Sequence, residues 1–233
     1  MSGRILSRCS AIAALSLITP VIHAQCSWVM SDYVKNKPVI ADTVCEITST
    51  TPWGTFTQTS AGKYWRSRDG STREDTAWKT TSISIQDRMV VFIDHESKSA
   101  TVQAMGDHVY VWPVPRRLEN NPGTTRTGIL AGRPVIGKHM ESFFGTGTGA
   151  EVWIAKDLQL LVDVNVTGET FRQTQQLRNI EEREPEAALF KIPEGYSVVK
   201  CVNNPPPPGG PPIGPLSHCY QETPKNQSGE QKR

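Results

Sequence analysis

The sequence predicts a mainly β fold: a curved antiparallel sheet or half-open β-barrel with one or two short helices, followed by a disordered proline-rich C-terminal tail. Between Ser27 and Lys200, short runs of alternating apolar and polar residues recur between turn-forming residues, as in neighbouring antiparallel strands. Helical patterns are few, and the composition changes after Lys200. We therefore divide the chain into a signal peptide (1–24), a β-rich domain (25–200) and a tail (201–233).

The N-terminal segment has the layout of a secretory signal peptide. Arg4 and Arg8 form a basic start, residues 11–18 form an apolar run, and Ala24 is the small residue before the expected cleavage site. The run is shorter than the roughly 20 residues of a transmembrane helix. We expect a periplasmic or secreted protein of a bacterial envelope, with no transmembrane segment after signal removal.

The charge balance argues against nucleic acid as a partner. The whole chain has 25 Lys and Arg against 23 Asp and Glu, and two of the arginines lie in the signal peptide. The mature chain is therefore neutral and has no overall field that would attract nucleic acid or an anionic membrane.

Four cysteines remain after processing, and an oxidising compartment favours disulfides between them. They are Cys26, Cys45, Cys201 and Cys219. Three pairings are possible, and we favour the two local ones, Cys26–Cys45 and Cys201–Cys219. The chain has no C-x-x-C motif, so we expect no metal site.

The expected elements follow one another in chain order. Alternation, β-branched residues and turn signals predict strands in the hairpin 63–75 around Asp69-Gly70, and in 82–86, 89–94, 99–105, 108–115, 150–155, 157–168 and 169–184. Residues 120–128 and the glycine-rich 145–149 are expected to be loops. Short helical turns are expected at 27–37 and, between two prolines, at 184–193, where Leu189 and Phe190 would fold back onto the sheet.

The hairpin 63–75 is rich in arginine. We expect Arg66, Arg68 and Arg73 to form a solvated face, with Tyr64 or Trp65 turned inward. Anion or headgroup binding by these arginines is the alternative.

Aromatic residues give the candidate ligand-binding face. All six tryptophans lie in the mature chain, and on strands they build a core or line an apolar cleft. Tyr64, Trp65, Trp112 and Trp153 are the candidate residues of such a face.

We expect no catalytic residue and no cofactor. Asp94, His95 and Glu96 are adjacent, but neighbours on a strand point to opposite faces, so we expect them to be solvated residues beside a turn. The Gly145–Gly149 stretch lacks the context of a dinucleotide-binding loop. The proline-rich tail, which holds eight of the seventeen prolines, is either a disordered spacer or a ligand for a partner.

Residues 63–199 resemble a group of uncharacterised bacterial exported proteins. The resemblance is carried by YWRSRDGSTRED, SISIQDRMVVFIDHESKSATV, GRPVIGKHMESFFGTGTGAEVWIAKDLQLLVDV and, most specifically, LRNIEEREPEAALFKIPEGYSVV. This chain departs from the group at Gln86-Asp87-Arg88 and Asp94-His95, where the group has Asp-Pro pairs. More distantly the pattern is similar to the periplasmic lipoprotein-carrier (LolA-like) fold, which implies a half-open sheet that holds acyl chains.

These observations favour a non-enzymatic binding module that holds a lipid or lipopeptide in a concave apolar face. The alternative is a structural or stress-sensing envelope protein that binds a partner protein through a sheet edge or the tail. An apolar cavity would favour the first hypothesis, a filled core the second, and a convergent cluster of His and carboxylates an enzyme.

Overall fold

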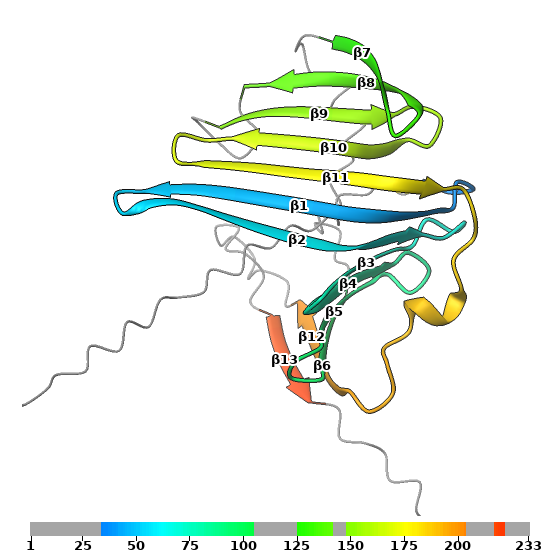
Figure 1. Cartoon of the computed structure of the whole chain (residues 1–233). Helices are drawn as coiled ribbons and strands as arrows, with labels where there is room; N and C mark the ends of the chain where they lie inside the picture. The colour runs from blue at the N-terminus through cyan, green and yellow to red at the C-terminus, as the bar shows by residue number, and fades with distance from the viewer. Residues whose placement is uncertain (1–33, 105–124, 142–147, 204–216, 222–233) are drawn as a thin grey trace, which may run out of the picture.

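The structure is a computed structural model that describes residues 34–104, 125–141, 148–203 and 217–221. These residues form one 13-stranded sheet and one short 3-10 helix, η1 (Ala187–Phe190) (Figure 1). The strands are β1 (Val39–Thr51), β2 (Gly54–Arg66), β3 (Thr72–Thr76), β4 (Lys79–Ser84), β5 (Met89–Asp94), β6 (Ser99–Ala104), β7 (Thr125–Leu130), β8 (Arg133–Met140), β9 (Gly149–Ala155), β10 (Leu160–Thr167), β11 (Phe171–Glu181), β12 (Ser197–Asn203) and β13 (Ser217–Gln221).

Two runs of consecutive antiparallel strands, β1–β6 and β7–β11, build most of the sheet. They join where β11 pairs antiparallel with β1, from Ile40 opposite Glu181 to Ser49 opposite Phe171. The chain then crosses to the other end of the first run, where β12 pairs parallel with β6 and β13 completes the order. The predicted mainly β, antiparallel fold is thus confirmed, with a single parallel pair among the described strands.

One face of β1 and β9–β11 carries the apolar core. Val39, Val152 and Leu177 lie on this face and are buried, and the alternating positions of each strand explain why. In β10 the register shifts between Leu161 and Asp163, and the buried side chains there are consecutive, 160–162. The valines and leucines that the sequence pattern marks as alternating therefore do form a packed layer, which we call the apolar layer.

The opposite face is covered at β3–β6 by the chain between β11 and β12, residues 182–196, which we call the crossover segment (Figure 1). Ile93, Ala100 and Val102 are buried on this face. The main-chain amide of Ser197 donates to the carbonyl of Lys98 at 3.0 Å, which fixes the end of the segment. The predicted helical turn is confirmed as η1.

A polar network holds the crossover segment to the sheet. The Thr80 hydroxyl donates to Asp75 Oδ1 at 2.6 Å and lies 2.9 Å from His95 Nε2, while His95 Nδ1 lies 3.0 Å from the Tyr196 hydroxyl. Because the single proton of Thr80 goes to Asp75, Nε2 donates to Thr80, and in the neutral imidazole Nδ1 then accepts from the Tyr196 hydroxyl. Beside it, Arg73 donates to both carboxylate oxygens of Asp75, at 2.6 and 2.9 Å.

The expectation of a solvated arginine face is wrong for two of its three residues. Arg66 is 0% exposed and donates to the carbonyls of Lys37 and Leu158, at 2.8 Å each. Arg73 is 7% exposed, lies 5.9 Å from the Trp65 ring centre and donates to the carbonyl of Leu189. Both faces of this part of the sheet are covered, so alternation buries the arginines as well as the aromatic residues.

His95 also differs from expectation. It is half-buried and bonded to Thr80 and Tyr196, whereas the neighbouring Glu96 is exposed. The Asp94 carboxylate accepts the Ser97 amide at 2.8 Å, as in a turn. As expected, Asp94, His95 and Glu96 do not converge, because neighbours on a strand point to opposite faces. The expectation that all three are solvated is wrong for His95, since the crossover segment covers its face.

Most predicted strands are confirmed, and β5 has the predicted bounds. The loop expected at 120–128 is wrong from Thr125 onward, because β7 begins there and pairs with β8. The sheet also continues past the predicted boundary at 200/201, through the end of β12 to β13. The signal peptide, the strand expected at 108–115 and most of the helix expected at 27–37 lie outside the described residues.

Candidate functional site: a pocket beside the crossover segment

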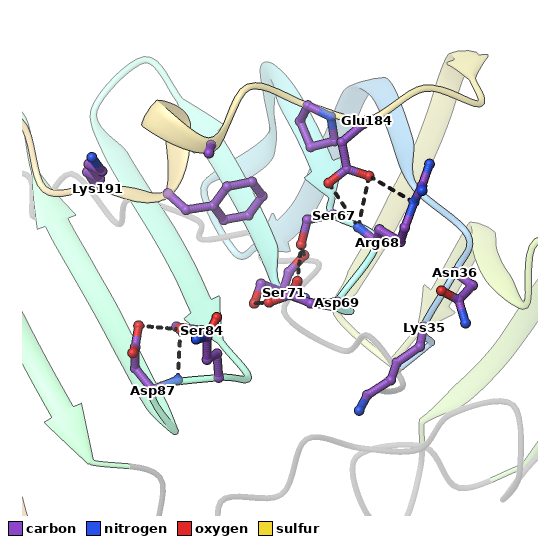
Figure 2. Close-up of a pocket in the computed structure, with 14 residues that line it drawn as sticks. Lys35, Asn36, Ser67, Arg68, Asp69, Ser71, Ser84, Asp87, Glu184 and Lys191 are labelled. Carbon is purple, nitrogen blue, oxygen red and sulfur yellow. Dashed lines mark hydrogen bonds and ion pairs between the residues drawn. The ribbon is translucent and has the colours of Figure 1, made fainter.

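A pocket of about 760 Å³ opens where four segments that are distant in sequence meet (Figure 2). We call it the junction pocket. It is lined from the residues before β1, the β2–β3 turn, the β4–β5 turn and the crossover segment: 35–36, 67–71, 84–87 and 184–191. Apolar atoms come from Pro185, Ala187 and Phe190, and most of the remaining lining residues are polar or charged.

The β2–β3 turn forms a rigid wall of the pocket. Gly70 has φ +94°, which glycine adopts without strain, and its amide donates to the Ser67 carbonyl at 3.0 Å. Asp69 accepts the Ser71 amide and hydroxyl, at 2.9 Å each, and the Ser67 hydroxyl. Partial burial by itself would raise the pKa of Asp69, but these hydrogen bonds outweigh it and hold the pKa below its ordinary value.

Glu184 docks the crossover segment onto the same turn. Its two carboxylate oxygens each lie 3.1 Å from the Arg68 main-chain amide that donates to them, and Arg68 Nε lies 3.9 Å from one of them. Figure 2 shows this carboxylate pointing at Arg68. A third carboxylate, Asp87, accepts the Ser84 hydroxyl at 2.8 Å. All three acidic groups of the pocket are therefore engaged within the protein.

The cations of the pocket are less engaged. Among the described residues, the side-chain ammonium groups of Lys35 and Lys191 form no hydrogen bond or ion pair, and the Arg68 side chain is 70% exposed. In Figure 2 the two lysines lie on opposite sides of the pocket. With its carboxylates satisfied and these ammonium groups available, the pocket offers positive charge beside an apolar wall.

The four candidate aromatic residues do not share one face. Tyr64 and Trp65 are both buried but, as strand neighbours, point to opposite faces of β2. Trp153 is half-buried, and a Cβ at Gly137 would lie 2.7 Å from its ring, so any larger residue there would have to displace the indole. Trp112 lies outside the described residues. The structure brings none of the three described residues to the junction pocket.

Sequence reasoning missed the junction pocket. Its hairpin turn and its helical turn were both predicted, but nothing in the pattern says that these segments meet. Their meeting depends on the crossover segment, hence on the long-range order of the strands.

Cys45 and Cys201 are both disulfide-bonded. On the backbone, Cys201 of β12 lies directly opposite Cys219 of β13, which suits the local pairing that we favour. The pairing itself, and the role of Cys26, stay predictions.

A smaller pocket of about 280 Å³ lies between the β7–β8 turn and the β10–β11 pair. Asp163 lines it, and burial, together with the charge of Glu151, raises the pKa of this carboxyl although Gln176 donates to it at 2.7 Å. Across the described residues there is no cluster of three or more side chains suited to a metal ion. None of the helices in that part of the chain is long and apolar enough to cross a membrane.

No protein-family model and no curated protein matches this chain. Solved structures resemble its fold. An uncharacterised conserved protein from Thermus thermophilus has a TM-score of 0.47 at 10% identity, over 71% of this chain and 91% of that chain. MucB has a TM-score of 0.41 at 16% identity, over 78% of this chain and 66% of MucB. A LolA superfamily protein from Nitrosomonas europaea has a TM-score of 0.26 at 4% identity, over 70% and 94%.

The expected likeness to the lipoprotein-carrier fold is thus confirmed as a structural resemblance at low identity. The resemblance concerns the fold alone.

Proposed function

We propose that the protein is a non-catalytic binding module of the bacterial envelope, and that its junction pocket binds an acidic segment of a partner protein. The observation that carries the proposal is the state of the charges: the pocket's carboxylates are bonded within the protein, whereas the ammonium groups of Lys35 and Lys191 are available. An incoming carboxylate would therefore meet ammonium groups and no competing free acid.

The packing of the described core supports a protein partner over an enclosed lipid. Val39, Val152 and Val166 are at most 1% exposed, so the apolar layer is filled where the structure describes it. The larger described pocket is lined mostly by charged and hydrogen-bonding residues, with an apolar wall on one side only. These features match the filled-core case, in which binding takes place at the surface.

The polar network does not suit catalysis. It brings a hydroxyl, an imidazole and a carboxylate together, but Thr80, the residue between Asp75 and His95, is 1% exposed. A substrate atom has no room beside a hydroxyl that is bonded on both sides and covered by the crossover segment. We infer that the network is structural.

A lipopeptide or anionic lipid is the second candidate ligand. The observation that favours it is the apolar side of the pocket, where Pro185, Ala187 and Phe190 lie next to Lys191. A short acyl chain could contact this wall while an anionic head meets the lysine. MucB, one of the proteins of similar fold, has been solved in complex with MucA. Our proposal rests on the pocket and not on that likeness.

Binding of defined probes tests the proposal. Fluorescence anisotropy with the mature chain would compare three labelled peptides. The first is an acidic peptide built from Glu, Phe and Ser, the second is a peptide of equal length with Lys in place of Glu, and the third is the acidic peptide with an N-terminal acyl chain. We expect the bare acidic peptide to bind and the basic one not to bind. Lys35→Glu with Lys191→Glu should weaken binding about tenfold or more, because each reversal replaces an attraction by a repulsion.

Lys98→Glu with Lys156→Glu is the matched control, since both lysines are exposed and lie outside the pocket. This control should leave binding unchanged. Binding of the acylated peptide alone would select the second candidate. Equal binding of acidic and basic peptides, or equal loss in both double variants, would contradict a role for the junction pocket.

A further inference from the structure

Half of β2 is an open sheet edge. β1 pairs with all thirteen residues of β2, but β3 pairs only with Gly62–Arg66. No strand of the described chain pairs with the outer edge of Gly54–Ala61, and residues 54–59 are exposed. The β1–β2 hairpin also projects past the neighbouring strands at its tip (Figure 1). The outward N–H and C=O groups of this stretch can therefore pair with a further strand.

The usual protections of an open edge are missing here. Natural edges carry lysine, proline, a bulge or a very short strand. Residues 54–61 contain neither charge nor proline, and the pairing with β1 runs through thirteen residues without a register shift. Charged residues are absent from the whole stretch 47–62. The edge is thus regular, long and uncharged.

The residue pattern along the edge is nearly symmetric about Thr57. On one face lie Thr55, Thr57 and Thr59, and on the other Phe56 and Gln58 flank the centre. Two identical strands paired antiparallel about a twofold axis through Thr57 would place Thr57 opposite itself and Thr55 opposite Thr59. Threonine pairs of this kind already join β1 to β2, where the hydroxyl oxygens of Thr48 and Thr57 lie 3.1 Å apart and those of Thr50 and Thr55 lie 3.4 Å apart.

Exposed aromatic residues mark both ends of the edge. Trp53, in the turn at the hairpin tip, is 88% exposed, and Trp78, in the β3–β4 turn, is 58% exposed. The β3 pairing ends at Thr76 opposite Gly62, so Trp78 follows directly where the open edge stops. A twofold axis at Thr57 exchanges the two ends. It therefore brings Trp53 of each copy toward Trp78 of the other.

We propose that this edge pairs with the same edge of a second copy of the chain, forming a twofold dimer through Gly54–Ala61. The absence of charge favours a second copy, because identical strands meet like charges across a twofold axis and this edge has none to repel. Symmetry of the threonine pattern and the placement of the two tryptophans point the same way. The dimer lies beyond the proposed function and does not depend on it.

Sedimentation equilibrium of the mature chain over a wide concentration range tests the dimer. We expect a reversible monomer–dimer equilibrium. Thr57→Lys and Thr57→Glu should each weaken dimerisation at least tenfold by placing like charges on the axis, and an equal mixture of the two variants should restore it. Thr50→Lys on β1 is the matched control, because it also removes a threonine pair but lies one strand inside the edge.

Cysteine pairs fix the register. Thr57→Cys should form a disulfide-linked dimer on mild oxidation, and Thr55→Cys should cross-link with Thr59→Cys more efficiently than with itself. A monomer at all concentrations would overturn the proposal and leave the edge to a strand of another protein. A dimer that tolerates Thr57→Lys, or that fails to regain strength in the Lys and Glu mixture, would place the interface elsewhere.

Discussion

The two covered faces of the sheet are packed by different chemistry. On β1 and β9–β11 the apolar layer consists of aliphatic side chains, with Val152, Val162 and Val166 at 2% exposed or less. On β3–β6 the layer under the crossover segment includes the Arg73–Asp75 ion pair and the Thr80–His95–Tyr196 chain of hydrogen bonds. We call the second one the polar layer.

The difference shows how each kind of packing determines the position of the elements that it joins. Aliphatic packing is tolerant of direction, so the apolar layer needs only the right alternation and volume. A hydrogen-bonded layer accepts one arrangement, because every buried donor and acceptor must find its partner. No side chain of η1 is fully buried, and hydrogen bonds with the polar layer, from Arg73 to the Leu189 carbonyl and from the Tyr196 hydroxyl to His95, hold the crossover segment in place.

The largest expected effect concerns Arg66, a charged residue at the border of the apolar layer. Arg66→Met keeps the side-chain stem but leaves the carbonyls of Lys37 and Leu158 without their charged donor. We expect the free energy of unfolding to fall by about 4 kcal/mol, since hydrogen bonds to charged groups contribute roughly 1.5–3 kcal/mol each. Urea denaturation measures this, with the exposed Arg68→Met as the control that changes it by about 0.5 kcal/mol or less. If Arg66→Met left the free energy of unfolding unchanged, burying the guanidinium would cost as much as its hydrogen bonds contribute.

A smaller effect is expected in the polar layer. Thr80→Val preserves shape but removes the hydroxyl that links Asp75 to His95. Stability should fall by about 1–2 kcal/mol, the usual cost of a buried group left without its partner. Limited proteolysis should at the same time cut the crossover segment faster. Thr81→Val, on the opposite face of the same strand, should do neither, and equal behaviour of the two variants would refute a fastening role for the network.

The smallest effect is a pH dependence on the solvent side of the apolar layer. The pKa of Asp163 is raised chiefly by burial, so the folded state binds its proton more tightly than the unfolded state. Its contribution to stability is therefore greatest below pH 3.8, the ordinary value, and is lost as the pH rises through the raised pKa. Asp163→Asn should gain stability relative to wild type across that rise, by less than about 1 kcal/mol because the side chain is partly solvated.

Asp42→Asn gives the opposite sign and serves as the comparison. Hydrogen bonds from Asn179 and Lys63 lower the pKa of Asp42, so its contribution is present above pH 3.8 and is lost as the pH falls through the lowered value. Denaturation curves of both variants between about pH 3 and 7 would separate the two cases. If the stability of both variants relative to wild type changed with pH in the same direction, the opposite pKa shifts of Asp163 and Asp42 would be contradicted.

Prediction from sequence succeeded where one strand contains its own evidence. β5 is a run of β-branched and aromatic residues, β6 alternates, and a polar turn separates them; both were predicted. β7 (TRTGIL) and β8 (RPVIGKHM) contain glycine or proline and show little alternation, so they were missed. β8 takes its place in the sheet by pairing with β9, and β7 by pairing with β8, which the local pattern of neither strand encodes.

The burial of the arginines was missed for a related reason. Alternation assigns Trp65 and Arg66 to opposite faces, and the charge of Arg66 suggested that its face meets water. In the structure both faces are covered, one by the crossover segment and the other by the turn that carries Leu158 and Gln159, whose carbonyls Arg66 binds. Those contacts join residues about 90 positions apart, so the covering layers cannot be inferred from the hairpin.

The pairing of β1 with β11 also sets an order of assembly. Each run of antiparallel strands can form from neighbours in sequence, but the seam between them joins Ile40 to Glu181. Closing so long a loop costs chain entropy before any contact compensates for it, so this step should be slow compared with the formation of the hairpins. The pairing of β12 with β6 is a second long-range closure, since it joins Ser197 to Ser99. A newly made chain would therefore pass through a stage with two half-sheets and unpaired inner edges, and that stage is when it most needs protection from aggregation.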